Sequence, residues 1–426
     1  MNRRLAALLA AVILLSAACS ASGPASTAAG IELAAAHIPR AAVPQANLSI
    51  AADGMTAFGL SLYRALASEP GNLVFSPASI ELALAMARPG ARGETAGQMD
   101  AVMHDVGADA NADSINALDV ALAGRSGTFT DAEGTSLPVT LRIANAPFAQ
   151  AGMPIEPAYL DALASRFGAG LRLVDYQRAA DVARGLINEW VRDTTNGKIA
   201  QLMAPGTLDA MTRLVLVNAI YLKAPWATPF DAERTASGTF TKADGTTVQV
   251  PMMSATEALR YASGAGWRAV ELPYLGDQLV LDVLLPDDLA SFERALDPQV
   301  FARITASLAG QEVELSLPRF GATTQADLAT VLASLGMPLA FDRDRADFSG
   351  ITAAERLFIA HVVHEATITV DEKGTEAAAA TAVAMAATAM PAEPVVLRVD
   401  RPFLFALRDR PTGAVLFLGR IVDPSE

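Results

Sequence analysis

Hydrophobic and polar residues follow the periods of regular secondary structure from about residue 50 to the C-terminus. Met55, Phe58, Leu62 and Leu66 recur at helical spacing, which predicts an amphipathic helix at the start of this region. The nearly unbroken apolar run of residues 214–222 predicts a central strand that is buried on both faces. Helical and strand patterns are interspersed, without a fixed repeat or an internal linker, so we expect a single mixed α+β domain.

Turn and breaker residues divide the same region into elements. Pro77 ends a short apolar strand at 72–75 and precedes a helical pattern, and Asp244-Gly245 predicts a hairpin turn before a strand at 248–253. The other strands are expected at 139–148, 279–285, 313–320, 395–400, 403–408 and 414–421. The other helices are expected at 94–103, 155–166, 179–195, 288–308 and 324–335. Residues 105–135 give no clear pattern.

The stretch Asp371–Pro391 does not match its surroundings. It follows an alternating strand pattern that ends at Val370, and Pro394 comes soon after it, so its position predicts a surface loop. After Glu376 it consists of Ala, Thr, Val and Met, without a charge, a glycine or an earlier proline. Such side chains suit a buried segment, although an alanine-rich helix or a linker would also account for them when the stretch is taken alone.

Composition narrows the classes of partner. The chain has 426 residues, of which 52% are hydrophobic and 18% charged, enough for a large core. Its formal net charge is −14, and no run of lysine or arginine stands out. Because polyanions are bound by basic surfaces, we expect no binding to nucleic acid, to heparin-like polyanions or to anionic membrane surfaces.

The N-terminus has the order of an export signal. Arg3 and Arg4 precede the apolar residues 5–15, which are too few to span a bilayer, and small residues follow before Cys19. This order resembles a bacterial lipoprotein signal, in which Cys19 becomes the lipidated first residue. An ordinary secretory signal that is cut near a cysteine is the alternative. Ser20, in place of an aspartate, favours the outer membrane if lipoprotein sorting applies.

These signals predict three parts of the chain. We expect residues 1–18 to be a signal peptide, residues 19–48 a flexible tether rich in Ala, Ser, Gly and Pro, and residues 49–426 a single domain. The expected location is extracytoplasmic, either lipid-anchored at the outer membrane or cell surface, or else periplasmic or secreted. Cys19 is the single cysteine, so an intramolecular disulfide is excluded.

The sequence offers no recognisable catalytic constellation. The four histidines are His37, His104, His361 and His364. The segment His361–Glu365 matches neither HExxH nor its inverse, and on a strand residues three apart point to opposite faces. No G-x-S-x-G elbow and no phosphate-binding loop occurs. We therefore expect that the protein is not an enzyme and that it uses no metal and no cofactor.

Eight short stretches, spread over residues 50–426, carry patterns that are informative in combination. They are Phe75–Ile80, Asn196–Ile199, Asn218–Lys223 with Trp226, Pro251–Met253, Leu317–Phe320, Asp371–Ala378, Arg401–Phe403, and Leu418–Arg420 with Pro424. In this order they resemble the serpin family of serine protease inhibitors. Each stretch alone is weak, but the combination, with the alanine-rich tract in its place, is specific.

The resemblance implies a fold of three β-sheets and eight or nine helices with an exposed reactive-centre loop, in a monomer. It also implies a mechanism of irreversible, suicide-substrate inhibition. A target serine protease attacks the loop and forms a covalent acyl-enzyme, and the cut loop then inserts as a new strand in the large sheet before water can release the enzyme. The implied partner is therefore the target protease.

The resemblance also places a hinge at the start of the loop. It comprises Glu372, Gly374, Thr375, Glu376, Ala377, Ala378, Ala379 and Ala380. A segment that must enter a sheet between two strands needs small, uncharged side chains and no proline in its ladder. Because the four alanines meet this condition, we expect an inhibitor, and a non-inhibitory serpin acting as a binding or structural protein is the alternative.

The resemblance further implies where the protease cuts. The attacked bond lies at about the seventeenth residue counted from Glu372, which predicts cleavage between Thr388 and Ala389. The next candidates for the attacked residue are Ala387, Met385 and Met390. No arginine, lysine or aromatic residue occurs from 377 to 390, so we expect a target with a shallow, apolar specificity pocket, either elastase-like or subtilisin-like.

Five further residues match positions that serpins use to control opening of the large sheet. Ser76, Ser79, Asn218 and His364 correspond to the shutter, the group that holds the central strands together. Small hydroxyl, amide and imidazole groups can exchange hydrogen bonds at low cost, although a lone buried histidine is more often a core residue. Trp226 corresponds to the breach, where the loop first enters. Ala224 and Pro225 depart from the family's pattern beside it.

Overall fold

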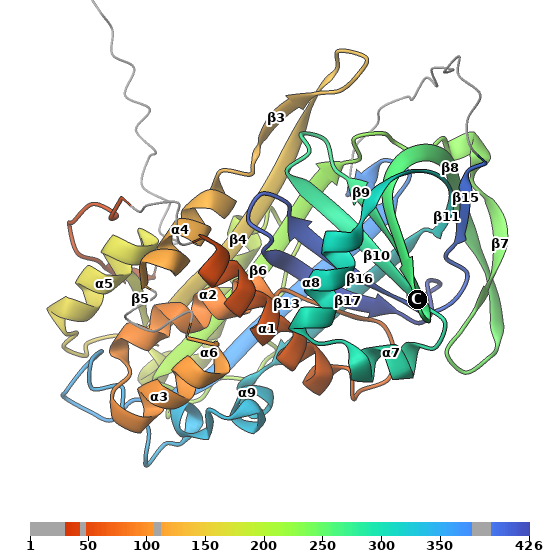
Figure 1. The fold of residues 1–426 in the computed structure, drawn as a ribbon. Coiled ribbons are helices and arrows are strands. Elements are labelled where there is room, and N and C mark those ends of the chain that lie inside the picture. Colours follow the sequence, from red (N-terminus) through yellow and green to blue (C-terminus); the bar gives the residue numbers. More distant parts are fainter. Residues whose placement is uncertain (1–29, 43–47, 106–111, 377–392) are drawn as a thin grey trace, which may run out of the picture.

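The computed structural model describes residues 30–42, 48–105, 112–376 and 393–426. Within these residues the chain forms nine α-helices and two hydrogen-bonded sheets, of eight and nine strands. Most helices gather in one half of the molecule and the nine-stranded sheet fills the other, with the long strands β4, β6 and β13 running between them (Figure 1). The expected mixed α+β fold with eight or nine helices is confirmed.

The eight-stranded sheet has the order β1–β5–β4–β6–β14–β13–β12, with β3 paired to β4 beside this path. Its strands are β1 (Glu32–Ala34), β3 (Gly127–Thr130), β4 (Ser136–Gln150), β5 (Leu171–Val174), β6 (Leu214–Pro225), β12 (Phe320–Asp327), β13 (Ile359–Asp371) and β14 (Gly374–Thr375). In β6, eleven of the twelve residues are buried, which confirms the predicted central strand.

The nine-stranded sheet has the order β15–β11–β8–β9–β10–β16–β17–β2, with β7 paired to β8. Its strands are β2 (Leu73–Phe75), β7 (Ala236–Thr241), β8 (Thr247–Gly264), β9 (Trp267–Pro273), β10 (Leu279–Pro286), β11 (Ala309–Pro318), β15 (Val395–Arg398), β16 (Phe403–Asp409) and β17 (Val415–Ile421). The long strand β8 pairs with β7 and β11 along most of its length and with β9 at its end. Because β8 is continuous, the described strands form two sheets instead of the three that the resemblance implied.

The helices are α1 (Leu48–Leu66), α2 (Pro77–Ala87), α3 (Gly93–Val102), α4 (Ala112–Ala123), α5 (Pro157–Phe167), α6 (Tyr176–Thr194), α7 (Leu289–Ala295), α8 (Pro298–Ser307) and α9 (Ala329–Leu335). The helical pattern predicted at 288–308 is two helices, because Asp297 caps α8 and Pro298 occupies its first turn. The helix predicted at 324–335 was wrong in its first part, since β12 continues to Asp327 before α9 begins.

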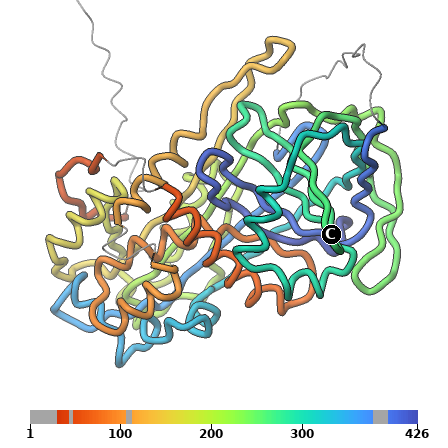
Figure 2. The backbone as a smooth tube through the Cα atoms, viewed as in Figure 1, coloured from red at the N-terminus to blue at the C-terminus, as the bar shows by residue number. Residues whose placement is uncertain are grey.

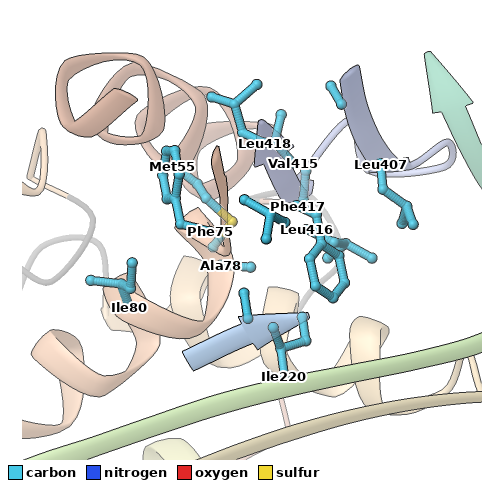
Figure 3. Close-up of a cluster of buried hydrophobic side chains, with 14 of the residues drawn as sticks. Met55, Phe75, Ala78, Ile80, Ile220, Leu407, Val415, Leu416, Phe417 and Leu418 are labelled. Carbon is cyan, nitrogen blue, oxygen red and sulfur yellow. The ribbon is translucent and has the colours of Figure 1, made fainter. Parts of the chain in front are cut away.

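A hydrophobic core joins the two sheets to the helices. Phe75 and Ala78 lie at the junction of β2 and α2, where Ser76 accepts a hydrogen bond from the Ser79 amide and caps the helix. Figure 3 shows these side chains packed with residues of α1, β6 and β17. Every residue of α2 is buried, so this helix lies inside the molecule beneath the eight-stranded sheet.

Residues 30–42 lie against the domain, although we predicted a flexible tether there. β1 extends the sheet by pairing antiparallel with β5, and the Ala41 amide donates to the Ser165 carbonyl of α5. Arg40 donates to Asn116 at 2.8 Å and contacts Asp119 at 2.6 Å, both on α4. In Figure 2 this red segment lies beside the yellow segment that contains α5. The described part of the expected tether is therefore a docked strap.

The predicted signal peptide lies outside the described residues. Among the helices of the described ranges, none combines the length and the apolar content that a bilayer crossing requires.

Candidate functional site

The two central strands of the eight-stranded sheet separate at one end. β6 and β13 pair directly and in parallel from Leu214 and Ile359 as far as Ile220 and Ala366. Beyond these residues, β14 lies between them and pairs antiparallel with both. The site is thus a seam between β6 and β13 that is closed along most of its length and holds two residues of the predicted hinge at its open end.

Backbone geometry makes Gly374 necessary at this entrance. Its φ is +140°, and a Cβ atom there would lie 2.2 Å from the carbonyl oxygen of Ala224 and 2.7 Å from Cα of Pro225. No other residue can approach β6 so closely. Thr375 follows with 2% of its surface exposed, and its hydroxyl lies 2.6 Å from the Tyr274 hydroxyl inside the core. The hinge therefore enters the sheet with a small residue and then a satisfied polar one.

Trp226 holds the chain just before the hinge. Its backbone amide donates to the Lys373 carbonyl, and its indole Nε1 donates to the Asp371 carbonyl, both at 2.9 Å. Its ring stacks on Tyr274 with centroids 4.5 Å apart and 14° between the planes. Trp226 thus connects the turn before β14 to the same tyrosine that receives Thr375.

The carboxylate of Glu372 fixes the other side of this turn. Arg319 Nε lies 2.8 Å from both carboxylate oxygens, and Thr235 Oγ1 donates to Oε1. Burial raises the pKa of Glu372, but the hydrogen bonds from Arg319 and Thr235 outweigh burial and hold the pKa below its ordinary value. The Glu372 carbonyl also accepts from the Phe230 amide at 2.8 Å, so both parts of the residue are anchored.

Glu376 is the last described residue before the loop. Its φ is +51°, an unusual value for a residue with a side chain, and its amide donates to the Thr369 carbonyl at 3.3 Å. Its carboxylate contacts Lys198 and Tyr221. Glu376 thus adds one further backbone hydrogen bond to β13 beyond the two residues of β14.

The predicted shutter residues lie together halfway along the seam. Asn218 of β6 is directly opposite His364 of β13, and its side-chain oxygen bonds His364 Nδ1. His364 Nε2 accepts from the Ser76 amide at 3.1 Å, so Nδ1 carries the proton. Ser79 donates to Asn145 of β4 at 2.9 Å. Polar groups from three strands and the start of α2 thus meet where the strands would have to part.

Burial determines the charge of this cluster. Desolvation lowers the pKa of His364 from 6.5 to about 3, so the ring is neutral near pH 7. Asn218, which like His364 is fully buried, has no partner for its side-chain Nδ2 among the described residues. An unmet donor in the seam makes the closed arrangement less favourable than a fully satisfied one.

Helix α6 covers the seam on the opposite face of the sheet. Ile187 and Val191 of α6 pack in one cluster with Val215 and Val217 of β6 and Val363 of β13. The even-numbered residues of β6 instead face the main core. A strand entering between β6 and β13 would therefore place alternate side chains in the core and under α6.

All nine predicted site residues that the structure describes fall into these two groups, and their roles remain predictions. Ser76, Ser79, Asn218 and His364 form one cluster, while Trp226, Glu372, Gly374, Thr375 and Glu376 surround the entrance. His361 pairs with Asp327 at 2.6 Å and does not join His364.

The other predicted site residues are not covered by the described ranges, so the structure neither supports nor contradicts their assignment. They are the lipidation residue, the second half of the hinge and the reactive-site bond: Cys19, Ala377, Ala378, Ala379, Ala380, Thr388 and Ala389. The described part of the predicted hinge therefore ends at Glu376, and the insertion of the four alanines stays a prediction.

Sequence reasoning missed several residues at the entrance. Arg319 and Lys198 belong to stretches that carried the resemblance, but no role was assigned to them. Tyr274 and Asn145 gave no signal, because an aromatic residue at the end of a strand and an asparagine within one are ordinary patterns. Only the fold brings them to the seam.

Comparison with known proteins supports the resemblance over almost the whole domain. A family model described as "Serpin (serine protease inhibitor)" matches residues 53–424. An uncharacterized serpin-like protein of Thermococcus kodakarensis is 37% identical over 380 residues, covering 88% of this chain and 86% of that protein. A leukocyte elastase inhibitor of Bos taurus is 38% identical over 385 residues, covering 87% of this chain and 98% of that protein.

Solved structures agree with this result. The native state of tengpin, a thermophilic serpin, matches with a TM-score of 0.79 and 26% identity, over 91% of this chain and 97% of that one. The likeness extends beyond the motifs to the arrangement of helices and sheets.

Proposed function

The chain belongs to the serpin family, and we propose that it is an irreversible, suicide-substrate inhibitor of serine endopeptidases with small, apolar specificity pockets. The observation that carries this proposal is β14, where two hinge residues already lie between β6 and β13. Directly ahead of them the facing edges of these two strands pair with each other. The open end of the seam between β6 and β13 therefore already holds the first residues of the segment that would insert.

The register of β14 supports insertion of the rest of the loop. Thr375 pairs with Ala224 and Val370, so continuing the register would bring Thr388 opposite Met211 and Leu357, just past the far ends of both strands. Thirteen further residues at about 3.3 Å each carry the cut end roughly 40 Å. A protease attached there would be drawn to the opposite end of the sheet.

The loop sequence matches the two faces that this register assigns. Thr375 faces the core, so Thr381, Val383 and Met385 would also face the core. The residues between them are alanines, which would lie under α6 beside the cluster that contains Ile187 and Val191. The alternation of larger and smaller side chains therefore fits a strand with one face in the main core.

The covalent step follows the chemistry of serine proteases. The protease serine oxygen would attack the carbonyl carbon of Thr388, the bond to Ala389 would break, and the new amine would leave with a proton from the enzyme's histidine. Thr388 would remain as an ester on the serine. If a dozen backbone hydrogen bonds form on insertion at ~1 kcal/mol each, the fall is on the order of 10 kcal/mol, comparable to the stability of a whole domain.

The residues around the predicted bond define the target class. The stretch 377–390 has no side chain that suits an acidic or a deep aromatic specificity pocket. A shallow pocket that accepts Thr, Ala or Met fits an elastase-like protease, and a subtilisin-like one fits as well. Several similar proteins carry the name leukocyte elastase inhibitor, which supports the first.

We also propose that the protein is exported and carries a lipid on Cys19. The support is the order of the first nineteen residues, with two arginines, a short apolar run and small residues before the cysteine. Labelling of producing cells with a fatty-acid analogue should mark the wild-type protein and not Cys19→Ser. Equal labelling of both, or labelling of neither, would contradict the lipid.

The test of inhibition is incubation with pancreatic elastase and, in parallel, with trypsin, followed by mass spectrometry of the intact mixture. We expect a covalent complex with elastase, and release of a C-terminal peptide that begins at Ala389. Thr375→Arg is the matched control, because a charge at a position with 2% exposure should block insertion and leave a cleaved substrate. Inhibition of trypsin but not elastase refutes the target class. Cleavage of the loop without any complex favours the non-inhibitory alternative.

A further inference from the structure

Three polar side chains meet where the hinge leaves the sheet. Lys198 Nζ lies 2.9 Å from Oε2 of Glu376, with side-chain exposures of 50% and 17%. Tyr221 of β6, with 7% exposure, lies close enough to the same carboxylate for its pKa to be raised by it. Burial, and then the charge and hydrogen bond of Glu376, raise the pKa of Tyr221 to about 12, so its hydroxyl keeps its proton and donates it.

Lys198 is presented to the hinge by the end of α6. The chain turns directly after the helix, with positive φ at Asn196 and Gly197, and the Gly197 amide donates to the Arg192 carbonyl at 2.7 Å. Ile199 then anchors the turn in the cluster between α6 and the sheet, with 1% exposure. The backbone of Lys198 is therefore fixed on the same face of the sheet as Tyr221.

The position of the carboxylate distinguishes the two possible registers of an entering strand. With Thr375 facing the core, the next residue faces the α6 side, where Lys198 and Tyr221 lie. A slip of one residue would turn Glu376 into the hydrophobic core, which is unfavourable for a carboxylate without partners. The charge is thus tolerated in one register only.

We infer that Lys198 and Tyr221 are hinge-positioning residues, which bind the Glu376 carboxylate on the α6 face and so fix the register in which the chain enters between β6 and β13. This inference rests on the proposed function for its consequence, because register matters only if the loop inserts. The contact itself belongs to the intact protein and can be tested there.

Hydrogen exchange of the intact protein decides whether the pair holds the hinge. In Lys198→Met, the amides of 374–376 should exchange about five-fold faster, as expected for the loss of one partly buried ion pair. The buried strand β16 should exchange as in the wild type, which excludes general destabilisation. Lys198→Arg should restore protection. Lys242→Met is the matched control, since it removes a lysine whose partner is Asp423, away from the hinge. Unchanged exchange at the hinge in Lys198→Met overturns the inference.

The ratio of inhibitor molecules that are cleaved as substrate to those that trap a protease tests the register in which the hinge enters the sheet. Lys198→Met should raise the number of inhibitor molecules consumed per protease, because Glu376 is left partly buried without its cation. Lys198→Met combined with Glu376→Gln should return close to the value of Glu376→Gln alone, and Tyr221→Phe should show a smaller rise. Additive effects in the double variant contradict a shared site. A wild type that forms no complex would instead refute the proposed function, while the exchange result would still decide the hinge contact.

Discussion

At the scale of single residues, the seam depends on a histidine that is neutral and fully buried. His364 accepts from the Ser76 amide and donates to Asn218, and a protonated ring could not accept. Its pKa of about 3 in the folded protein lies below the ordinary 6.5. Below pH 6.5 the unfolded chain therefore takes up a proton that the native protein does not, so this residue lowers stability as the pH falls toward 3.

Substituting His364 tests this account. Glutamine can accept from the Ser76 amide and donate to Asn218, but it does not titrate. In the wild type, His364 lowers the free energy of unfolding by up to ~1.4 kcal/mol per pH unit between pH 6.5 and 4. His364→Gln should remove this contribution, so its melting temperature should fall less over the same pH range. Thermal melts at a series of pH values would show it. His37→Gln, at an exposed histidine, is the control and should keep the wild-type slope. A variant with an unchanged slope would mean that the buried ring is not the source.

A second buried group has no apparent part in the seam. Glu81 of α2 has 0% exposure, and neither carboxylate oxygen has a hydrogen-bond partner in the described ranges. Burial raises the pKa of Glu81 well above its ordinary value. The contribution of Glu81 to stability is therefore most favourable below its unfolded pKa of about 4.5 and becomes increasingly unfavourable as the pH rises.

Replacing Glu81 should therefore stabilise the intact protein. Methionine has a similar volume and no unmet polar atom, so Glu81→Met is expected to add ~2 kcal/mol of native stability at pH 7.5, and less at pH 5. Melting temperatures at both pH values give the comparison. A loss of stability at both would show that Glu81 has a partner that its surroundings do not reveal.

The role of a single residue could be predicted from the sequence only where the residue lies in a stretch that resembles the family. Ser76, Asn218 and His364 could be assigned because they lie in stretches that resemble the family. Asn145 completes the same cluster from β4, yet it is one polar residue in a strand pattern. Tyr274 meets Thr375 across a hundred residues of chain. Contacts of this kind arise from the fold and leave no local pattern.

At the scale of elements, β14 is the two-residue strand on which the proposed insertion depends. Gly374 can pass β6 only because it has no Cβ. Gly374→Ala should therefore expel the hinge from the sheet and convert the inhibitor into a substrate, with at least a ten-fold rise in turnover per complex formed, a barrier change of about 1.4 kcal/mol. Gel analysis of elastase mixtures would count cleaved and complexed protein. An alanine variant that inhibits like the wild type would mean that β14 is not on the path.

The strap is the second element with a testable role. Asp119 of α4 is largely buried, and burial raises its pKa more than the attraction of Arg40 lowers it. Arg40→Met would leave this carboxylate without its cation, which should cost about 1–3 kcal/mol and release β1 from the sheet edge. Urea unfolding would measure the loss, and the double variant with Asp119→Asn should recover most of it. Equal stability of Arg40→Met and wild type would show that the strap contributes nothing.

The elements that the sequence predicted well are those with a clear local pattern, either a mostly apolar strand or a turn motif. β6, β10 and β17 consist mostly of apolar residues, and the turn between β7 and β8 contains Asp244-Gly245. The sequence did not predict the strap, because an edge strand of three residues in an Ala- and Pro-rich segment has no detectable period. The second half of β12 was mispredicted as the start of a helix, because its alternating polar residues before α9 also match a helical start. In both segments the strand conformation is set by pairing with a neighbouring strand, β5 for the strap and β13 for β12.

At the scale of the whole molecule, the described fold is one of two that the chain can adopt under this account. In the intact protein β6 and β13 pair directly as far as Ile220 and Ala366, and β14 lies between them beyond that point. Among the described residues, Asn218 Nδ2 has no hydrogen-bond partner in this seam. In the cleaved protein a full strand would lie in that seam and pair on both sides. The difference in stability between these states is the energy that would trap the protease.

The most direct test is therefore a pair of thermal melts, on the intact protein and on protein whose loop has been cut at any bond near Thr388. Insertion of the cut loop, at on the order of 10 kcal/mol, should raise the melting temperature by about 10 °C or more. Cut and intact samples that melt at the same temperature would contradict the account, because no stored energy would then be released by cleavage.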